Sequence, residues 1–529
     1  YLPRVGHHVY NGSAWVNEGL LAESEARTNI IPYSNEFDHS TSWVRENTAV
    51  TADDAISPSG NEDALRIAET TTADTFRFVT RSQTQSAGDY TFSAYLKKET
   101  RDYAVLTIRA DGGAKRHAVK FNLADGTFVE QRTLGTPSNA LYGIQDVGNG
   151  WYRCYVSITH SGGSLISLIS PNAETNSGSG INFEYVGDGS SGIYAYQAQT
   201  EVGLTPSSLI PTSGSSVTRP AETFTIPSAN LPWPEPRYIG SELVTNGTFD
   251  SDLSGWTAGS SWSWDDGKAY DGDTAGAPNS LFSQSINVTS GKVYAVSFDV
   301  SGLSGGTPTV TWAGSTLVQI TADGSYEKYV VATTSNDTIE FGGSNAVFYI
   351  DNVSVREIDP LSVSIAMDGR MTYADTDGSE AIPFRWQDSA TDYIEYELVT
   401  TGSRTGAFGF KQEENNVQDK VQTSTTFYSP DLLVPLGVAS RHGSTFINGA
   451  NDGVALTADT TPTALPDLSA TDLSLAYDYM GTIGTFRVWD RDIEDDGLVE
   501  ATNPSLEPSL SLTFEGTGTN SFVVNNWSE

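Results

Sequence analysis

Four aromatic residues in a short, loop-rich part of the chain could form a platform for a ring-shaped ligand: Trp262, Trp264, Tyr270 and Trp312. Sugar rings present apolar C–H faces that pack against exposed aromatic rings, while neighbouring polar groups bind the hydroxyls. The alternative is that these side chains fill the core of a domain. Trp262 and Trp264 are separated by one residue and would share one face of a strand, so they are the strongest candidates for carbohydrate binding.

Two acidic residues, Glu395 and Glu397, flank Tyr396 and would also share a strand face. Paired carboxylates cleave a glycosidic bond when they oppose each other across it and one has a raised pKa. Neighbours on one strand do not provide this arrangement, so we expect a solvated strand face. The six histidines form no His-Glu-x-x-His motif, no Gly-x-Ser-x-Gly motif precedes an expected helix, and no Walker-type loop occurs. We therefore predict no catalytic residues and no enzymatic activity.

The composition favours sheets joined by tight turns. Thr, Ser, Gly, Tyr and Val are abundant, whereas residues that favour helices are under-used. A chain of 529 residues is too long for one hydrophobic core, and its length suggests about three or four domains. The predicted fold class is all-β, with β-sandwich (jelly-roll) domains in series.

The charge excludes several kinds of partner. The chain carries 29 basic and 66 acidic residues, a formal net charge of −37. Such a surface repels phosphate backbones and anionic lipids, so we expect no nucleic-acid partner and no membrane insertion. Cys154 is the only cysteine, which excludes an intrachain disulfide and a cysteine-based zinc site. Large domains do not need disulfides, so an extracellular location remains compatible with the sequence.

Two parts of the chain resemble each other. Asn35-Glu36-Phe37-Asp38 with Trp43 is matched by Asn246-Gly247-Thr248-Phe249-Asp250 with Trp256. Each is followed by a strand with alternating apolar residues, at 90–96 and at 294–300, and each copy closes on an aromatic strand, at 193–196 and at 348–351. Two copies of one architecture explain this pattern, and they place Trp43 and Trp256 at equivalent positions, which favours a core position for both.

The chain divides into six predicted segments. The stretch 210–237 contains six prolines, a density typical of a semi-rigid linker. Residues 7–17 predict a hairpin around Asn11-Gly12, and residues 18–27 predict a short helical turn. The segments are an N-terminal hairpin or collar at 1–30, a first jelly roll at 31–210, the linker at 211–237, a second jelly roll at 238–359, a third sandwich at 360–502, and a tail at 503–529.

Several motifs between positions 18 and 222 resemble a module common in bacteriophage tail fibres and minor tail proteins. They occur in the same order as in that module: Ala26-Arg27-Thr28-Asn29, Tyr33-Ser34-Asn35-Glu36-Phe37, Tyr90-Thr91-Phe92-Ser93, Gly148-Asn149-Gly150-Trp151-Tyr152-Arg153 and Val217-Thr218-Arg219-Pro220.

The second and third domains resemble other modules. Asn246-Gly247-Thr248-Phe249-Asp250 and Tyr349-Ile350-Asp351-Asn352-Val353 make the second domain similar to calcium-stabilised jelly-roll carbohydrate-binding modules. That resemblance implies a structural calcium site formed by the Thr248 carbonyl, Asp250 and Asp351. The stretch 480–489 makes the third domain similar to concanavalin-A-like and laminin-G-like sandwiches.

Together these resemblances imply a phage tail fibre or receptor-binding protein. Such a protein lies in the extracellular virion tail, contacts other tail proteins, attaches to host cell-surface polysaccharide or glycan, and is expected to be a homotrimer. The alternative is a polysaccharide depolymerase or glycoside hydrolase in which these domains are accessory binding modules. A structural virion component that only spaces other proteins is a third possibility.

Overall fold

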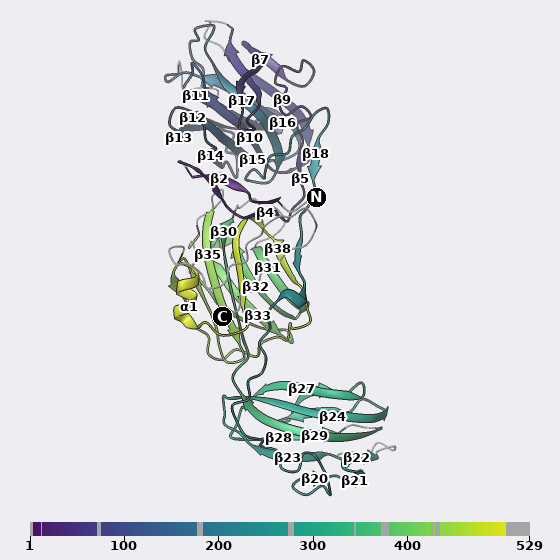
Figure 1. Cartoon of the computed structure of the whole chain (residues 1–529). Helices are drawn as coiled ribbons and strands as arrows, with labels where there is room; N and C mark the ends of the chain where they lie inside the picture. Colours follow the sequence, from purple (N-terminus) through teal and green to yellow (C-terminus); the bar gives the residue numbers. More distant parts are fainter. Residues whose placement is uncertain are drawn as a thin grey trace.

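The computed structural model describes residues 4–11, 13–70, 76–176, 183–272, 280–342, 345–371, 380–424, 427–428 and 434–503. The predicted tail lies outside this part of the chain, apart from Asn503. Strands dominate, and the α-helix in the described ranges is α1 (Glu494–Ala501). The predicted all-β class is confirmed. In Figure 1 the chain forms three bodies in a row, which we call sandwich one, two and three. None of the described helices is long and apolar enough to cross a membrane.

Sandwich one contains two six-stranded antiparallel sheets that enclose a core around Phe37, Trp43 and Phe92. The first sheet has the order β14 (Tyr142–Asp146), β15 (Trp151–His160), β10 (Gly88–Lys98), β17 (Gly192–Val202), β8 (Glu62–Glu69) and β7 (Thr48–Ile56). The second has the order β13 (Thr127–Leu134), β12 (Lys115–Asn122), β11 (Tyr103–Ala110), β16 (Gly163–Asn172), β9 (Phe78–Gln85) and β6 (Val44–Glu46).

Sandwich two contains two five-stranded antiparallel sheets. One has the order β21 (Trp262–Asp265), β22 (Lys268–Gly272), β29 (Ala346–Ile358), β24 (Val293–Gly305) and β27 (Gly324–Val331). The other has the order β20 (Thr257–Ala258), β23 (Phe282–Asn287), β28 (Asn336–Gly342), β25 (Thr309–Trp312) and β26 (Ser315–Gln319).

The strand orders of these two sandwiches match. The order β7-β8-β17-β10-β15 corresponds to β21-β22-β29-β24-β27, and β6-β9-β16-β11-β12 corresponds to β20-β23-β28-β25-β26. Sandwich one differs by the additional strands β13 and β14. Phe37 packs against Trp43 with ring centroids 5.0 Å apart, and Phe249 packs against Trp256 at 5.6 Å. The two sandwiches therefore share the architecture that the sequence repeat predicts.

Sandwich three collects its strands from distant parts of the chain. Its seven-stranded sheet has the order β1 (Arg4–Val5), β4 (Leu20–Glu23), β39 (Met480–Trp489), β30 (Ser362–Met371), β35 (Val434–Gly443), β36 (Ile447–Asn451) and β37 (Val454–Ala455). Its six-stranded sheet has the order β19 (Phe224–Ile226), β38 (Leu473–Asp478), β31 (Glu380–Ser389), β32 (Asp392–Val399), β33 (Phe408–Glu414) and β34 (Val417–Gln422).

The segments on either side of sandwich one thus belong to sandwich three. The predicted collar supplies β1 and β4, and the predicted linker supplies β19, whose Phe224 and Ile226 are buried in the core of sandwich three. Sandwich three accordingly lies between sandwich one and sandwich two in Figure 1, although it is the last in sequence. The same arrangement corrects one prediction: residues 20–23 form a strand, not a helical turn, because they pair with Met480–Ile483 of β39.

Two short ladders complete the N-terminal region. The predicted hairpin is present, since β2 (His8–Tyr10) pairs with β3 (Trp15–Asn17), and its turn is closed by the Asn11 side chain, which accepts the backbone N–H of Ser13 and of Ala14. β5 (Arg27–Asn29) pairs with β18 (Val217–Arg219), which brings the two ends of sandwich one together.

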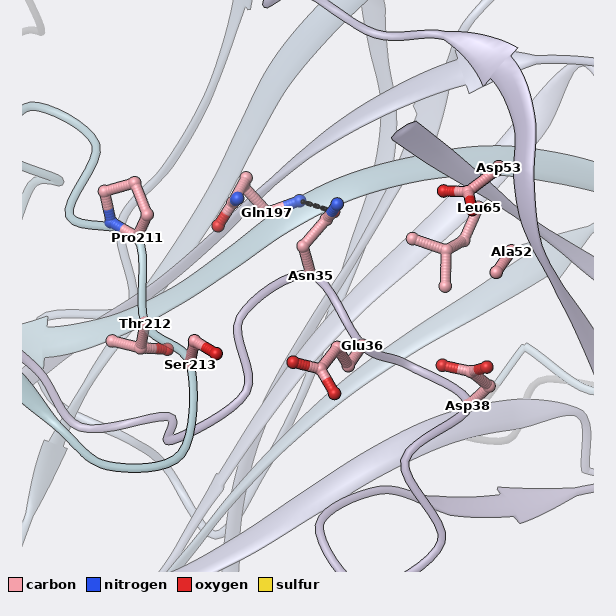
Figure 2. Close-up of a pocket in the computed structure, with 10 residues that line it drawn as sticks. All are labelled: Asn35, Glu36, Asp38, Ala52, Asp53, Leu65, Gln197, Pro211, Thr212 and Ser213. Carbon is pink, nitrogen blue, oxygen red and sulfur yellow. Dashed lines mark hydrogen bonds between the residues drawn. The ribbon is translucent and has the colours of Figure 1, made fainter. Parts of the chain in front are cut away.

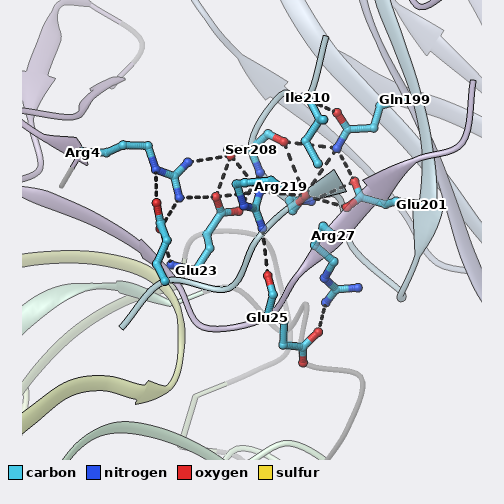
Figure 3. A network of polar contacts seen from close by, with 11 residues as sticks. Arg4, Glu23, Glu25, Arg27, Gln199, Glu201, Ser208, Ile210 and Arg219 are labelled. Carbon is cyan, nitrogen blue, oxygen red and sulfur yellow. Dashed lines mark hydrogen bonds and ion pairs between the residues drawn. The ribbon is translucent and has the colours of Figure 1, made fainter. Parts of the chain in front are cut away.

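A buried ionic network joins sandwich one to sandwich three (Figure 3). Glu23, at the end of β4, is 2% exposed and contacts Arg4 at 2.5 Å and Arg219 at 2.8 Å. Burial alone would raise the pKa of Glu23, but Arg219 and Arg4 together lower it. Ser208 donates its hydroxyl to the same carboxylate at 2.6 Å. The network fixes the junction because each buried charge has an oppositely charged or hydrogen-bonding partner.

The connection to sandwich two is a narrow neck made of two chain segments. The backbone N–H of Asp359 donates to the Arg237 carbonyl at 3.0 Å, and Tyr238 forms an antiparallel bridge with Ile358. A small apolar cluster that includes Val293 and Leu361 supports this contact. Sandwich two is therefore an insertion whose first and last residues lie side by side.

Candidate functional site

The face of sandwich two that points away from its core carries two adjacent rows of polar and aromatic side chains. The face belongs to the sheet β21-β22-β29-β24-β27. Cross-strand register aligns Ser263, Tyr270, Tyr349 and Ser301 in the first row. In the second row Asp265 is opposite Lys268, and Asp351, Asp299 and Ser325 follow in register. We call this surface the tyrosine face.

Strand alternation explains why the two tyrosines point outward. Ala269, Phe348 and Ile350 are fully buried in the core, so the residues between them project to the other side of the sheet. Tyr270 and Tyr349 are direct cross-strand neighbours, with ring centroids 4.8 Å apart and an interplanar angle of 37°. Their rings therefore form a continuous aromatic surface.

Two glycines leave room for these rings. A Cβ atom on Gly272 would lie 3.1 Å from the Tyr270 ring, and one on Gly302 would lie 3.2 Å from the Tyr349 ring. Gly302 also has a φ of 70°, which a residue with a side chain rarely adopts. The absence of side chains at both positions allows the aromatic rings to approach the sheet.

Hydrogen bonds fix the polar groups around the tyrosine pair. The Tyr349 hydroxyl donates to Asp265 Oδ2 at 3.0 Å, and Lys268 Nζ donates to Ser301 Oγ at 3.1 Å. The Asp265 carboxylate raises the pKa of the Tyr349 hydroxyl, because the neutral phenol is the hydrogen-bond donor. The Tyr349 side chain is thus held in place at its hydroxyl group.

The carboxylates of the second row differ in how they are bound. Ser325 Oγ donates to Asp299 at 2.5 Å and Asn352 Nδ2 donates to its other oxygen at 2.8 Å. These donors, with a contribution from nearby Lys268, lower the pKa of Asp299. Asp351 accepts the backbone N–H of Asn352 at 2.8 Å.

The structure corrects the predicted roles of Trp262 and Trp312. Trp262 is 7% exposed and stacks on Phe282 at 4.7 Å. Trp312 is 5% exposed and donates its indole N–H to Asp337 at 3.0 Å. Both rings lie in the hydrophobic core, where a sugar has no access.

Trp264 and Tyr270 are accessible, but on opposite sides of the sheet. Trp264 is opposite Ala269, so it shares the core side with Trp262, as its spacing predicts. It lies on an edge strand, is 44% exposed and donates its indole N–H to the Phe249 carbonyl at 2.7 Å. Tyr270 alone of the four predicted residues belongs to the tyrosine face. Its neighbour Tyr349 was not predicted as a site residue, although it lies between the apolar Phe348 and Ile350 and therefore has to face outward.

The two segments that carry the predicted calcium ligands lie next to each other in the fold. The backbone N–H of Val353 donates to the Gly247 carbonyl at 2.9 Å, which brings the segment with Thr248 and Asp250 next to the strand with Asp351. No cluster of three or more His, Cys, Asp or Glu side chains suited to a metal occurs in the described ranges. The predicted site contains two carboxylates and one carbonyl, so this finding does not test it, and the site stays a prediction.

A pocket of about 540 Å³ opens in sandwich one (Figure 2). Three carboxylates line it, those of Glu36, Asp38 and Asp53, and within the described residues none of them accepts a hydrogen bond or forms an ion pair. Asn35, which also lines the pocket, accepts the backbone N–H of Gln197 at 3.0 Å. No aromatic residue lines the pocket, so it lacks the apolar platform that the tyrosine face provides.

The corresponding outer face of sandwich one is partly covered by its own side chains. Trp151 and Tyr196 are 1% and 7% exposed there, and they pack with Leu209 from the segment after β17. Trp151 donates its indole N–H to the Ile56 carbonyl at 3.0 Å. On this surface sandwich one buries Trp151 and Tyr196, whereas Tyr95 and Tyr194 are only partly buried.

The expected solvated face around Glu395 and Glu397 is wrong. These side chains are 1% and 0% exposed. Lys411 contacts Glu395 at 3.1 Å and also pairs with Glu397, because β33 places it directly opposite Glu395. Arg385 pairs with Glu395 and Lys420 with Glu397. Both carboxylates are therefore held in a buried ion-pair network.

Comparisons with known proteins show little similarity. No known protein family and no curated protein matches the chain. A structure of NanB with Optactamide matches 27% of this chain and 24% of its own length, with 14% identity and a TM-score of 0.22. Mouse laminin alpha1 chain domains LG4-5 match 96% of this chain and 99% of their own length, with 8% identity and a TM-score of 0.20. Scores this low carry no argument about function.

Proposed function

We propose that this protein is a non-catalytic adhesin that binds a glycan on the tyrosine face of sandwich two. The observation that carries the proposal is the outward-facing pair Tyr270 and Tyr349, surrounded by side chains that can bind hydroxyl groups. A pyranose ring packs its C–H face on such a surface, and carboxylates next to it accept hydrogen bonds from the sugar hydroxyls.

The position of the face in the molecule supports this role. Figure 1 places β21 and β22 at the end of the row that is farthest from sandwich one. A surface at that end can meet a polymer or a cell wall without obstruction from the other sandwiches.

The wider biological role extends this proposal. The motifs shared with tail-fibre modules support a place in the tail of an extracellular phage particle, with host cell-surface polysaccharide as the ligand and other tail proteins as partners. Homotrimerisation belongs to the same proposal, whereas structural calcium at Thr248, Asp250 and Asp351 stays a separate prediction.

The test is retention of the purified chain on host-cell polysaccharide, with and without calcium. Replacing both tyrosines (Tyr270→Ala with Tyr349→Ala) should weaken binding at least about tenfold, because each lost stacking contact contributes about 1 kcal/mol. Tyr194→Ala, on the corresponding strand β17 of sandwich one, is the matched control and should bind as the wild type does.

Two outcomes would contradict the proposal. If the double variant bound as tightly as the wild type, the glycan would lie elsewhere. If the wild-type chain released reducing ends from the polysaccharide, the protein would be a hydrolase instead of a pure adhesin.

A further inference from the structure

We infer that the tyrosine face prefers glycans that carry free amino groups over neutral ones, and disfavours glycans that carry carboxylates. This inference rests on the proposed function and concerns the chemical class of the ligand. It follows from the charges and from the unused hydrogen-bonding capacity around Tyr349.

The face carries more negative than positive charge. Asp265, Asp299 and Asp351 lie in one row with a single cation, Lys268. Lys268 already donates to Ser301 on the far side of Tyr349. The whole chain has a formal charge of −37, so the electrostatic field of the rest of the protein adds to the excess of negative charge on this face. A ligand carboxylate placed on the tyrosines would therefore be repelled.

Two of these carboxylates retain an oxygen that can accept a ligand hydrogen. Asp265 uses Oδ2 for the Tyr349 hydroxyl, and Asp351 uses Oδ1 for the Asn352 backbone N–H. Within the described residues the second oxygen of each accepts no hydrogen bond. Ionised carboxylates only accept, so their ligand partner has to donate, and an ammonium group donates most strongly.

The arrangement of Asp299 and Asp351 adds a physical reason for a positively charged ligand. These two residues are directly opposite each other on neighbouring strands. Like charges at such positions destabilise a sheet. Ser325 and Asn352 both donate to Asp299, whereas Asp351 has only the Asn352 backbone N–H. Lys268 lies in the same row but donates to Ser301, so a second cationic group near Asp351 would relieve the remaining repulsion.

The experiment compares three oligosaccharides of equal length by titration calorimetry with the full chain: a glucosamine oligomer with protonated amines, its fully N-acetylated counterpart, and a uronic-acid oligomer. We expect the amine oligomer to bind about tenfold more tightly than the acetylated one, and the uronate oligomer to bind more weakly than both. Raising the salt concentration should reduce the difference, because the charges are exposed.

Variants separate the inference from the function on which it rests. Asp265→Asn with Asp351→Asn should weaken binding of the amine oligomer much more than that of the acetylated oligomer, so that the ratio of the two affinities falls to about one. Asp54→Asn with Asp388→Asn removes two exposed charges elsewhere and should leave the preference intact. Tyr270→Ala with Tyr349→Ala should weaken binding of all three ligands.

A failure of the inference and a failure of the proposed function give different results. Equal or tighter binding of the uronate oligomer, with the tyrosine variants still impaired, would overturn the inference and keep the proposed function. An effect of the aspartate variants that appears only with calcium present would also overturn it, because it would assign Asp351 to a metal. Absence of binding to any of the three ligands, or full binding by the tyrosine variant, would contradict the proposed function itself.

Discussion

Trp262 and Trp312 anchor the core of sandwich two through both their rings and their indole nitrogens. Trp262 stacks on Phe282 and donates to the Ser280 carbonyl at 3.2 Å. Each indole therefore satisfies its one donor while the ring fills the space between the two sheets. Both rings belong to the core, while Tyr270 and Tyr349 on the outer side of the sheet that contains Trp262 remain available for a ligand.

The two tryptophans of β21 should respond differently to replacement. Trp262→Ala is expected to lower the free energy of unfolding of sandwich two by about 3 to 5 kcal/mol, since it leaves a large cavity. Trp264→Ala should cost about 1 kcal/mol, mainly the hydrogen bond to the Phe249 carbonyl, and should leave glycan retention unchanged. Chemical denaturation and the polysaccharide assay check the two effects. Loss of retention in a folded Trp264→Ala protein would contradict the assignment of the ligand to the tyrosine face.

His442 should make sandwich three sensitive to acid. It is fully buried, and burial lowers its pKa from about 6.5 to about 3. Its Nε2 lies 2.7 Å from the Ser440 hydroxyl, which in turn lies 2.7 Å from the Tyr396 hydroxyl. Between pH 6.5 and pH 3 the unfolded state binds a proton that the folded state excludes. Stability is therefore complete above pH 6.5 and falls as the pH decreases.

The size of this stability change follows from the lowered pKa of His442. The free energy of unfolding should decrease by about 1 kcal/mol per pH unit between pH 6 and pH 4 because of this group. His442→Gln should be less stable at neutral pH, but its stability should depend less steeply on pH. Denaturant titrations at several pH values measure both slopes, and equal slopes in the two proteins would rule out His442 as the cause.

At the scale of residues, the spacing of side chains along a strand predicts which of them share a face. It does not predict which face of the sheet packs against the core. Trp262 and Trp264 do share one side of β21, as their separation predicts. Which side of β21 faces the core depends on the neighbouring strands β22 and β29, whose Ala269 and Ile350 are buried. The residues around the two tryptophans do not contain this information. In the same way, the lysines that pair with Glu395 and Glu397 come from other strands of the sheet, β33 and β34.

At the scale of elements, β19 shows how a short strand can be mistaken for linker. Its three residues lie between prolines at 220 and 227, yet they pair with β38 through Phe224 opposite Leu475 and Ile226 opposite Leu473. An edge strand tolerates such flanking prolines because only one side of it needs hydrogen-bond donors.

Replacing Phe224 tests this assignment. Phe224→Ala should lower the free energy of unfolding of sandwich three by about 3 kcal/mol, because the ring is buried in its core. Thr225→Ala on the exposed side of the same strand is the control and should change it by less than about 0.5 kcal/mol. Thermal unfolding followed by tryptophan fluorescence is a suitable measurement. No difference between the two variants would indicate that 211–237 acts only as a linker.

Strands with clear alternation were predictable, and pairings between distant segments were not. The stretch 294–300 lies within β24, as its pattern indicates. Residues 18–27 carry no comparable alternation, and all four residues of β4 are buried because sandwich three packs on them. The partner that makes this segment a strand lies at the other end of the sequence.

At the scale of the molecule, sandwich two should be removable. Ile239 and Glu357 are joined by a backbone hydrogen bond of 2.9 Å, so a two-residue Asn-Gly turn can replace residues 240–356. The shortened chain should keep sandwiches one and three folded, at a cost of about 1 to 2 kcal/mol for the lost packing on Leu361. Calorimetry should show one unfolding transition fewer, and glycan retention should be lost.

A second deletion provides the comparison. Excising residues 30–216 removes sandwich one, and it also removes Ser208, whose hydroxyl donates to the buried Glu23 carboxylate at the junction. This protein should be much less stable than the chain without sandwich two. Comparable stability of the two deletions would contradict the different attachment of the two sandwiches.

The pairing of β4 with β39 also determines when the central body can form during synthesis. At about 5 to 20 residues per second, the roughly 460 residues between Glu23 and Met480 take on the order of 20 to 90 s to translate. Sandwiches one and two are complete within their own stretches and can fold on the ribosome during that time. The apolar side of β4 and β19 has no partner until the last strands emerge. The cell therefore has to protect these two segments from aggregation until β38 and β39 have been translated.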